Sequence, residues 1–192
     1  MYFSKGNRKL SKNILVWNLP RLITCPGAGE CKKWCYETKF ERMYKNVLPC
    51  RMQNYRESKC FNFDDIVTQY LNNRKEKYVR IHESGDFYNQ EYLDHWKWIA
   101  ILNPRKKFYA YTKSFHLKFG HNHLIPNLRI IQSYGSKWDH LIDPDKPTFK
   151  AMPKWVIPNK HEFLCPGGGC GDTCTACMGP HAKKHVVIYI HR

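Results

Sequence analysis

Two short stretches near opposite ends of the chain share one arrangement of cysteine and glycine, and this repeat constrains the fold more than any other feature. Residues 24–36 read TCPGAGECKKWCY and residues 165–178 read CPGGGCGDTCTACM. Both contain C-P-G-x-G, then one further residue in the first only, then C-x3-C. Glycines let the backbone pass close to an inorganic centre, and closely spaced thiols can reach one ion. We therefore expect the same local geometry twice, as two cysteine-rich metal-binding loops.

The spacing of the thiols also bears on the metal. Zinc ribbons usually pair two C-x2-C knuckles, and here only Cys174 and Cys177 have that spacing. Cys170, Cys174 and Cys177 instead form C-x3-C-x2-C, the spacing of three-thiolate clusters in radical-SAM enzymes. We therefore favour one or two iron–sulfur clusters of the 4Fe–4S type, with zinc as the alternative. The predicted ligands are Cys25, Cys31, Cys35, Cys165, Cys170, Cys174 and Cys177.

The chain has nine cysteines, so complete pairing into disulfides would leave one over. Clustered cysteines in a reducing compartment more often hold metal. No apolar run is long enough for a signal peptide or a membrane span, so we expect a soluble, cytoplasmic protein with no membrane partner. Cys50 and Cys60 are predicted to be buried small hydrophobes, unless one completes the first site. His121 and His123 are predicted to be solvated rather than metal ligands.

Short runs rich in β-branched and aromatic residues alternate in part with helical patterns, which indicates an α/β fold. We expect a partial (β/α) barrel or an open, mostly parallel sheet, formed as a single domain over residues 1–192. The predicted helices are Phe63–Asn72, capped by Asn62, and Gln90–Leu102. The predicted strands are Asn13–Trp17, Tyr78–His82, Lys107–Thr112, Leu128–Ser133 and His185–His191.

Polar side chains follow three of these strands, where the ligand sites of α/β proteins lie. Glu83, Ser84 and Asp86 follow one strand, Lys113 follows the next, and residues 132–135 close a third. The competing interpretation is that Asp86 only bonds local N–H groups in a turn and that Lys113 is exposed. Nothing in the sequence signals serine-hydrolase, P-loop or zincin chemistry.

Basic residues outnumber acidic ones by 32 to 16, a formal charge of +16. The excess is greatest in residues 1–60, which hold 13 basic and 4 acidic side chains. We therefore expect a nucleic-acid partner, although a solvated basic surface that keeps the protein soluble is the alternative. The predicted phosphate-binding residues are Lys9, Lys12, Lys32, Lys33, Lys39 and Arg42.

Several strings together resemble the phage and plasmid gene-product-eighty-eight domain family, over about residues 10–178. They are residues 17–20 (WNLP), 24–28 (TCPGA), 31–36, 80–87 and 111–114 (YTKS). The family looks related to radical-SAM-like phage proteins. The resemblance implies S-adenosylmethionine (SAM) as a second cofactor, with Glu83, Ser84 and Asp86 gripping its amino group. It also implies catalytic roles for Asp86 and Lys113. The loop after the first strand departs from the radical-SAM pattern, because it carries C-x5-C-x3-C.

We therefore expect an iron–sulfur protein of phage or mobile-element type, similar to radical-SAM proteins and acting on or near nucleic acid. Whether it is an enzyme is open. The alternative is a non-enzymatic module that binds nucleic acid or protein and is stabilised by zinc or a structural iron–sulfur cluster. A zinc-dependent nuclease or regulator is a third interpretation.

Overall fold

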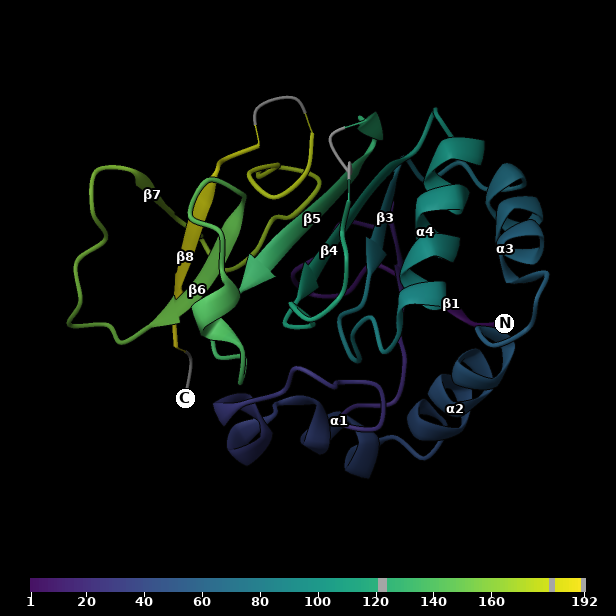
Figure 1. The fold of residues 1–192 in the computed structure, drawn as a ribbon, viewed down its shortest axis with the longest axis horizontal. Coiled ribbons are helices and arrows are strands. Elements are labelled where there is room, and N and C mark those ends of the chain that lie inside the picture. The colour runs from purple at the N-terminus through teal and green to yellow at the C-terminus, as the bar shows by residue number, and fades with distance from the viewer. Residues whose placement is uncertain (121–123, 180–181, 191–192) are drawn as a thin grey trace.

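The computed structural model describes residues 1–120, 124–179 and 182–190, and Figure 1 shows how its elements are arranged. The predicted histidines His121 and His123 lie outside the described residues, as does His191. The helices are α1 (Glu37–Met43), α2 (Val47–Glu57), α3 (Phe63–Asn72), α4 (Gln90–Leu102) and the 3-10 helices η1 (Glu30–Trp34) and η3 (Asp139–Leu141). The strands are β1 (Phe3–Lys5), β2 (Ile14–Trp17), β3 (Tyr78–Ile81), β4 (Lys107–Thr112), β5 (Leu128–Ser133), β6 (Thr148–Met152), β7 (Glu162–Leu164) and β8 (His185–Tyr189).

All eight strands form one sheet in the order β1-β2-β3-β4-β5-β6-β8-β7. The six strands β2, β3, β4, β5, β6 and β8 are successive parallel neighbours, and β7 is also parallel to β8. Only β1 is antiparallel. The predicted α/β class and the open, mostly parallel sheet are therefore confirmed. The strands follow chain order almost throughout, as in barrels, but β1 and β7 stand at the two edges instead of pairing with each other.

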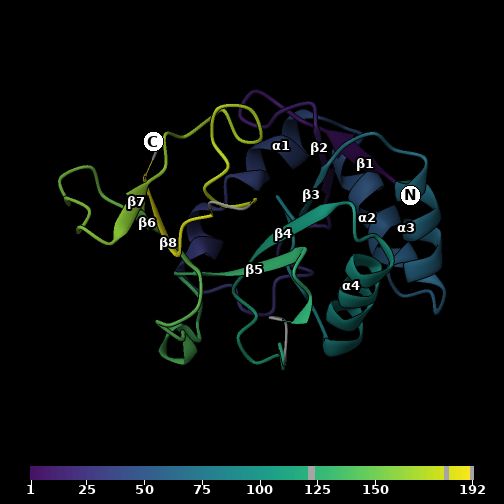
Figure 2. The ribbon, with the colours of Figure 1, turned by 90° about the horizontal axis from the view of Figure 1, so that it is seen from above.

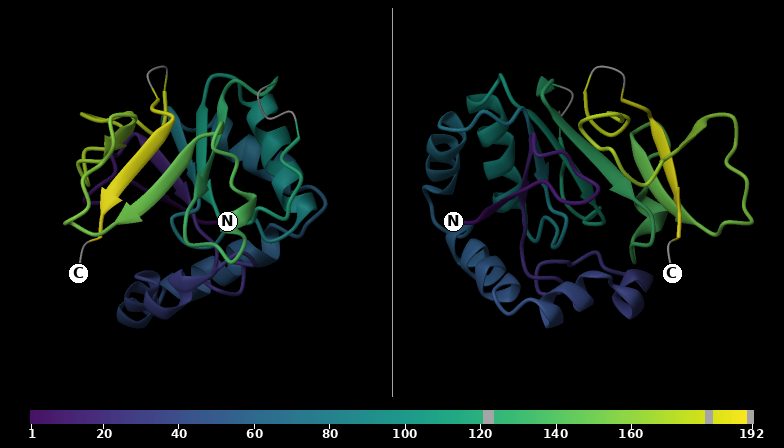
Figure 3. Two further views of the ribbon diagram at one scale, coloured as in Figure 1. Left: turned by 60° about the vertical axis from the view of Figure 1, so that its left-hand side comes forward. Right: turned by 180° about the vertical axis from the view of Figure 1, so that it is seen from behind.

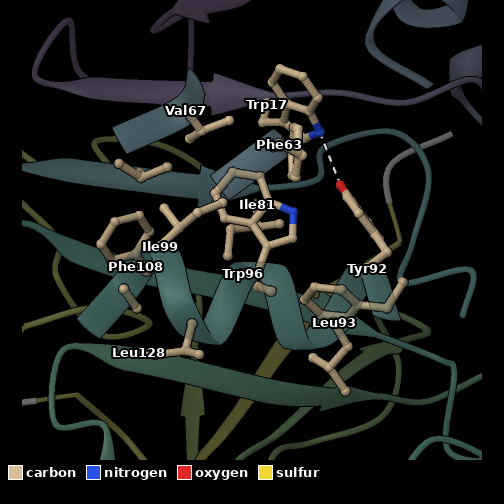
Figure 4. Packing of buried hydrophobic residues seen from close by; sticks show 14 of the residues in the cluster. Trp17, Phe63, Val67, Ile81, Tyr92, Leu93, Trp96, Ile99, Phe108 and Leu128 are labelled. Atoms are coloured by element: carbon tan, nitrogen blue, oxygen red, sulfur yellow. Dashed lines mark hydrogen bonds between the residues drawn. The ribbon is translucent and has the colours of Figure 1, made fainter. Parts of the chain in front are cut away.

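Helices α3 and α4 cover one face of the sheet over β2, β3 and β4, as the view from above shows (Figure 2). Trp17, Phe63 and Trp96 are at most 1% exposed and meet in the centre of this layer (Figure 4). Each such side chain contributes about 1.5–3 kcal/mol by burial. The helix predicted at 90–102 is confirmed, and its period-3.6 apolar residues all face this core.

The cap predicted for α3 is wrong in one respect. Asn62 precedes the helix, but its side chain makes no capping hydrogen bond. The side-chain cap belongs to α4, where Asn89 accepts from the N–H of Tyr92 at 3.0 Å. Asp64 in the first turn of α3 faces His95 of α4 instead, with 3.2 Å between Oδ1 and Nδ1. An acidic side chain in the first turn of α3 therefore links this helix to α4 and does not cap it.

No α-helix of the described residues covers the opposite face of the sheet, where the strands contribute buried side chains at Ile14, Val16, Tyr109, Ile131 and Val186. The segment around residues 165–178 packs there, and it contributes Cys177 and other apolar atoms to the same cluster. Figure 3 shows this C-terminal segment, coloured yellow, from two further sides. The second cysteine-rich stretch thus covers the sheet in place of a helix. Among the described helices, none is long and apolar enough to cross a membrane.

Candidate functional site

The first cysteine-rich stretch and helix α1 lie across the edge of the sheet where the parallel strands end (Figure 1). Ser136, just beyond β5, holds the stretch there: its Oγ lies 2.9 Å from the carbonyl oxygen of Gly27 and 2.8 Å from that of Lys113. The N–H of Lys137 also donates to Gly27 O at 3.1 Å. This edge is the usual position of ligand sites in parallel sheets.

Asp86 joins the ends of β3 and β4. Its Oδ1 accepts from Thr112 Oγ1 at 2.6 Å and from the N–H of Phe87 at 2.7 Å. Its Oδ2 accepts from the N–H of Lys113 at 2.8 Å. Burial raises the pKa of Asp86 to about 6, against the opposing effect of these hydrogen bonds. Both carboxylate oxygens are therefore engaged by the fold, but two of the three donors, on Thr112 and Lys113, come from the next strand end rather than from a local turn.

Lys113 is drawn across to the end of β5. Its Nζ donates to Ser133 Oγ and to the carbonyl oxygen of Tyr134, both at 2.6 Å. Burial lowers the pKa of Lys113, while nearby Cys31 and Asp86 act in the opposite direction. The ammonium group of Lys113 is thus half-buried and hydrogen-bonded at the end of β5, rather than exposed to solvent.

Glu83 and Ser84 form part of a turn fixed to the end of β2. Their N–H groups donate to Asn18 Oδ1 at 2.8 and 2.9 Å. The carboxylate of Glu83 accepts from Asn7 Nδ2 at 2.9 Å and lies 3.6 Å from Arg80. Ser84 is 2% exposed, and its Oγ has no hydrogen-bond partner among the described residues. Ser84 Oγ is consequently the one uncommitted side-chain group of the three residues predicted to grip SAM.

Cys25, Cys31 and Cys35, which we call the edge thiols, gather beside this strand end. Burial raises the pKa of Cys25 to about 12, and the charges of Asp86, Cys35 and Cys31 raise it further. Burial also raises the pKa of Cys31, whereas Lys113 lowers it. Ionised thiols so close to a buried carboxyl repel one another unless a cation stands among them.

Cys165, Cys170, Cys174 and Cys177, which we call the face thiols, gather on the open face of the sheet. Burial raises the pKa of Cys177 to about 11, and the charges of the other three thiols contribute to that shift. The N–H of Gly167 donates to Cys165 Sγ at 3.4 Å. Such N–H···S contacts accompany metal–thiolate centres, where they orient and stabilise the ligand sulfur.

Thiols are suitable donors for a metal–thiolate centre, so the chemistry of both groups fits such a centre. The arrangement of the side chains does not. In the described ranges, no group of three or more Cys, His, Asp or Glu side chains is arranged so that it could hold a metal ion. Binding would therefore require the thiols to turn toward a common point. Metal binding by these seven cysteines therefore remains a prediction.

The expectation that both stretches share one backbone geometry is wrong. Gly167 and Gly169 have φ values of +79° and +69°, which favour glycine. Their counterparts Gly27 and Gly29 do not have positive φ, and each instead allows close approach to the edge of the sheet. A Cβ on Gly27 would lie 1.9 Å from the carbonyl oxygen of Lys113. The shared glycine positions thus form a turn in the second stretch and a close contact with the sheet in the first.

Cys50 and Cys60 stand apart from both groups. Cys50 is half-buried on α2, and Cys60 is exposed just after α2, so the predicted burial of Cys60 is wrong. The thiol of Cys60 instead contacts the carbonyl oxygen of Arg56 at the end of α2, at 3.9 Å. The structure therefore gives no support to a fourth ligand from this pair.

The predicted phosphate-binding residues are all exposed, but they do not form one surface. Lys33, Lys39 and Arg42 line a groove of about 620 Å³ along α1, together with Cys35. The carbonyl oxygen of Lys9 instead accepts from the N–H of Cys170, beside the face thiols. The remaining two, Lys32 and Lys12, are exposed in η1 and in the turn before β2. Two aromatic side chains, Tyr36 and Phe40, also line the groove.

Fold and site together define an α/β protein with an open, mostly parallel sheet, one group of thiols over the carboxyl edge and another on the open face. The chain belongs to the gene product 88 family, whose model matches residues 1–162. The expected family is thereby confirmed, and the match ends before Cys165, so the face thiols lie outside it. The comparisons give no support to the radical-SAM relationship. No curated protein and no solved structure matches the chain.

Proposed function

We propose that this protein binds iron–sulfur clusters through its edge thiols and its face thiols and acts on or near nucleic acid. One observation carries the proposal. The fold gathers all seven motif cysteines into two groups, while it leaves Cys50 and Cys60 outside them. Grouped thiols can offer several thiolate ligands to one centre, which scattered buried thiols cannot.

The edge thiols suit a centre with an open position. Three protein thiols leave one site of a four-coordinate or cubane centre for another ligand, the arrangement that active metal centres use. The ammonium group of Lys113 favours the ionised form of Cys31. The face thiols, four in number, suit a closed centre that stabilises the cover of the open face. Bound iron and sulfide would supply redox chemistry at the edge.

Metal analysis tests this proposal. Protein purified anaerobically from iron-supplemented cells should contain iron and sulfide and absorb broadly near 400 nm, roughly where thiolate-to-iron transitions fall. Cys60→Ser should leave the iron content unchanged, because Cys60 is exposed and stands apart from both groups. Stoichiometric zinc without sulfide would overturn the iron–sulfur assignment, and metal-free protein would overturn both centres.

A non-enzymatic module is the second candidate, and the engagement of Asp86 favours it. Both carboxylate oxygens of Asp86 accept hydrogen bonds within the fold. A carboxylate so occupied is a poor grip for the amino group of SAM. Calorimetry with cluster-loaded protein separates the candidates: SAM binding that weakens in Ser84→Ala would favour the enzyme, and no binding would favour the module. Ser84→Ala suits this test because its Oγ supports no described hydrogen bond.

A further inference from the structure

Helix α1 carries an exposed groove whose lining combines cations with apolar and aromatic side chains. Besides Cys35 and Thr38, the lining residues are Lys33, Tyr36, Lys39, Phe40, Arg42 and Met43. Phe40 is 44% exposed and Met43 58% exposed. Large apolar side chains gathered on a surface mark an interaction site more often than they occur by chance.

The charges of α1 are sorted between its two sides. Glu37 and Glu41 face inward, where Arg51 of α2 pairs with both, the latter at 3.0 Å. Arg21 adds a second pair to Glu41 at 2.9 Å. The acidic residues of the helix are thus neutralised beneath it.

On the outer side of the helix, the cations have no such acidic partners. None of the ion pairs among the described residues involves Lys39 or Arg42. Lys33 pairs only with exposed Glu30, at 2.9 Å. The groove therefore presents positive charge and apolar surface together, which complements a ligand that carries both negative charge and planar rings.

Phe40 brings an aromatic ring into the groove, and Tyr44 stands just outside its lining. Phe40 and Tyr44 lie one helical turn apart, with ring centroids 6.3 Å apart and planes 13° from parallel. Nearly parallel exposed rings offer faces on which bases stack, and stacking on protein aromatics needs bases that are free of a duplex. A double helix presents phosphates but hides its base faces, so it would use the cations alone.

We propose that the α1 groove binds single-stranded nucleic acid, with Lys39 and Arg42 on the phosphates and Phe40 stacked on a base. The inference rests on the proposed action on nucleic acid and locates it. Since Cys35 also lines the groove, a bound strand lies beside the edge thiols. The groove thus brings the nucleic acid to the centre with the open position.

Fluorescence anisotropy with a labelled oligothymidine of about 20 nucleotides tests the groove, at salt concentrations rising from about 50 mM. Phe40→Ala should weaken binding about fivefold to 100-fold while leaving the salt dependence unchanged, because it removes stacking and no charge. Lys39→Gln/Arg42→Gln should weaken binding and lower the slope of log affinity against log salt by about 1.4, since single strands give about 0.7 per phosphate contact.

The matched control is Lys75→Gln/Arg105→Gln. It makes the same change of charge at exposed residues of a second hollow, which lies where β3 and β4 begin, away from their carboxyl ends. The control should bind like the wild type, and a duplex of the same length should compete weakly. Equal losses in control and groove variants, or tighter binding of the duplex, would overturn the inference.

Two results separate the groove from the nucleic-acid partner. Binding that survives the groove variants but is lost in Lys9→Gln/Lys12→Gln would overturn the groove and keep the nucleic-acid partner. Absence of binding at about 50 mM salt would overturn both the groove and that partner. The iron and sulfide content of the same samples reports separately on the metal centres.

Discussion

At the scale of single residues, His82 is the most constrained side chain at the end of β3. It is 3% exposed and adopts φ +67°, which β-branched and bulky residues avoid. Its Nε2 lies 2.8 Å from the hydroxyl of Tyr92, which also accepts from Trp17 Nε1 at 2.9 Å. Burial, with a smaller contribution from Arg80, lowers the pKa of His82 to about 3. The imidazole is therefore neutral in the folded protein.

This burial makes folding stability depend on pH. Below the unfolded pKa of about 6.5, the unfolded chain binds a proton at His82 that the folded chain refuses, so stability falls as the pH falls. His82→Asn removes the titration and tolerates the positive φ. From pH 7 to pH 5, the wild type should lose about 2 kcal/mol of unfolding free energy relative to this variant. Urea unfolding at both pH values measures this difference, and a constant difference would contradict it.

Asp86 acts as a connection between strand ends, and its pairing with Thr112 can be measured. Asp86→Ala leaves buried N–H groups without an acceptor, so it should cost at least about 2 kcal/mol of unfolding free energy. Thr112→Val removes the hydroxyl that donates to Oδ1 at 2.6 Å. In a double-mutant cycle the two losses should not add, with a coupling of about 1 kcal/mol or more. Additive losses would show that the two residues act separately.

At the scale of elements, one glycine from each cysteine-rich stretch allows a direct comparison. Gly27→Ala places a Cβ 1.9 Å from a backbone oxygen of Lys113, so the stretch must move off the sheet edge. We expect a loss of about 1–3 kcal/mol and less iron at the edge thiols. Gly168→Ala meets nothing within 4 Å and has no positive φ, so it should change stability by less than about 0.5 kcal/mol. Thermal unfolding and iron analysis distinguish the two variants. Equal effects would refute the close contact between Gly27 and Lys113.

Elements with strong periodicity could be predicted from the sequence, whereas short and polar ones could not. The helix Gln90–Leu102 and the strands Lys107–Thr112 and Leu128–Ser133 form where their patterns indicate. The edge strands β1 and β7 have three residues each, too few for a pattern to emerge. Helix α1 escaped notice because its inward residues are glutamates paired with arginine, so it lacks an apolar stripe.

At the scale of the whole molecule, the sheet divides its two faces between different kinds of cover. Helices α3 and α4 bury one face with large aromatic side chains, and the face thiols and their loop cover part of the other. Sequence spacing left open whether the thiols gather in two groups or meet around fewer centres, and it could not show that one group lies at an edge and the other on a face. That separation depends on contacts across the chain, such as the bonds between residues 9–11 and Cys170.

We propose that the edge thiols and the face thiols form two separate centres. Iron and sulfide per chain, measured on anaerobic protein whose fold is verified by circular dichroism, test it most directly. Cys31→Ser/Cys35→Ser and Cys170→Ser/Cys174→Ser should each lose one of the two clusters and keep the other. Loss of all iron and sulfide in either folded double variant, or of none in both, would show that the thiols do not form two separate centres.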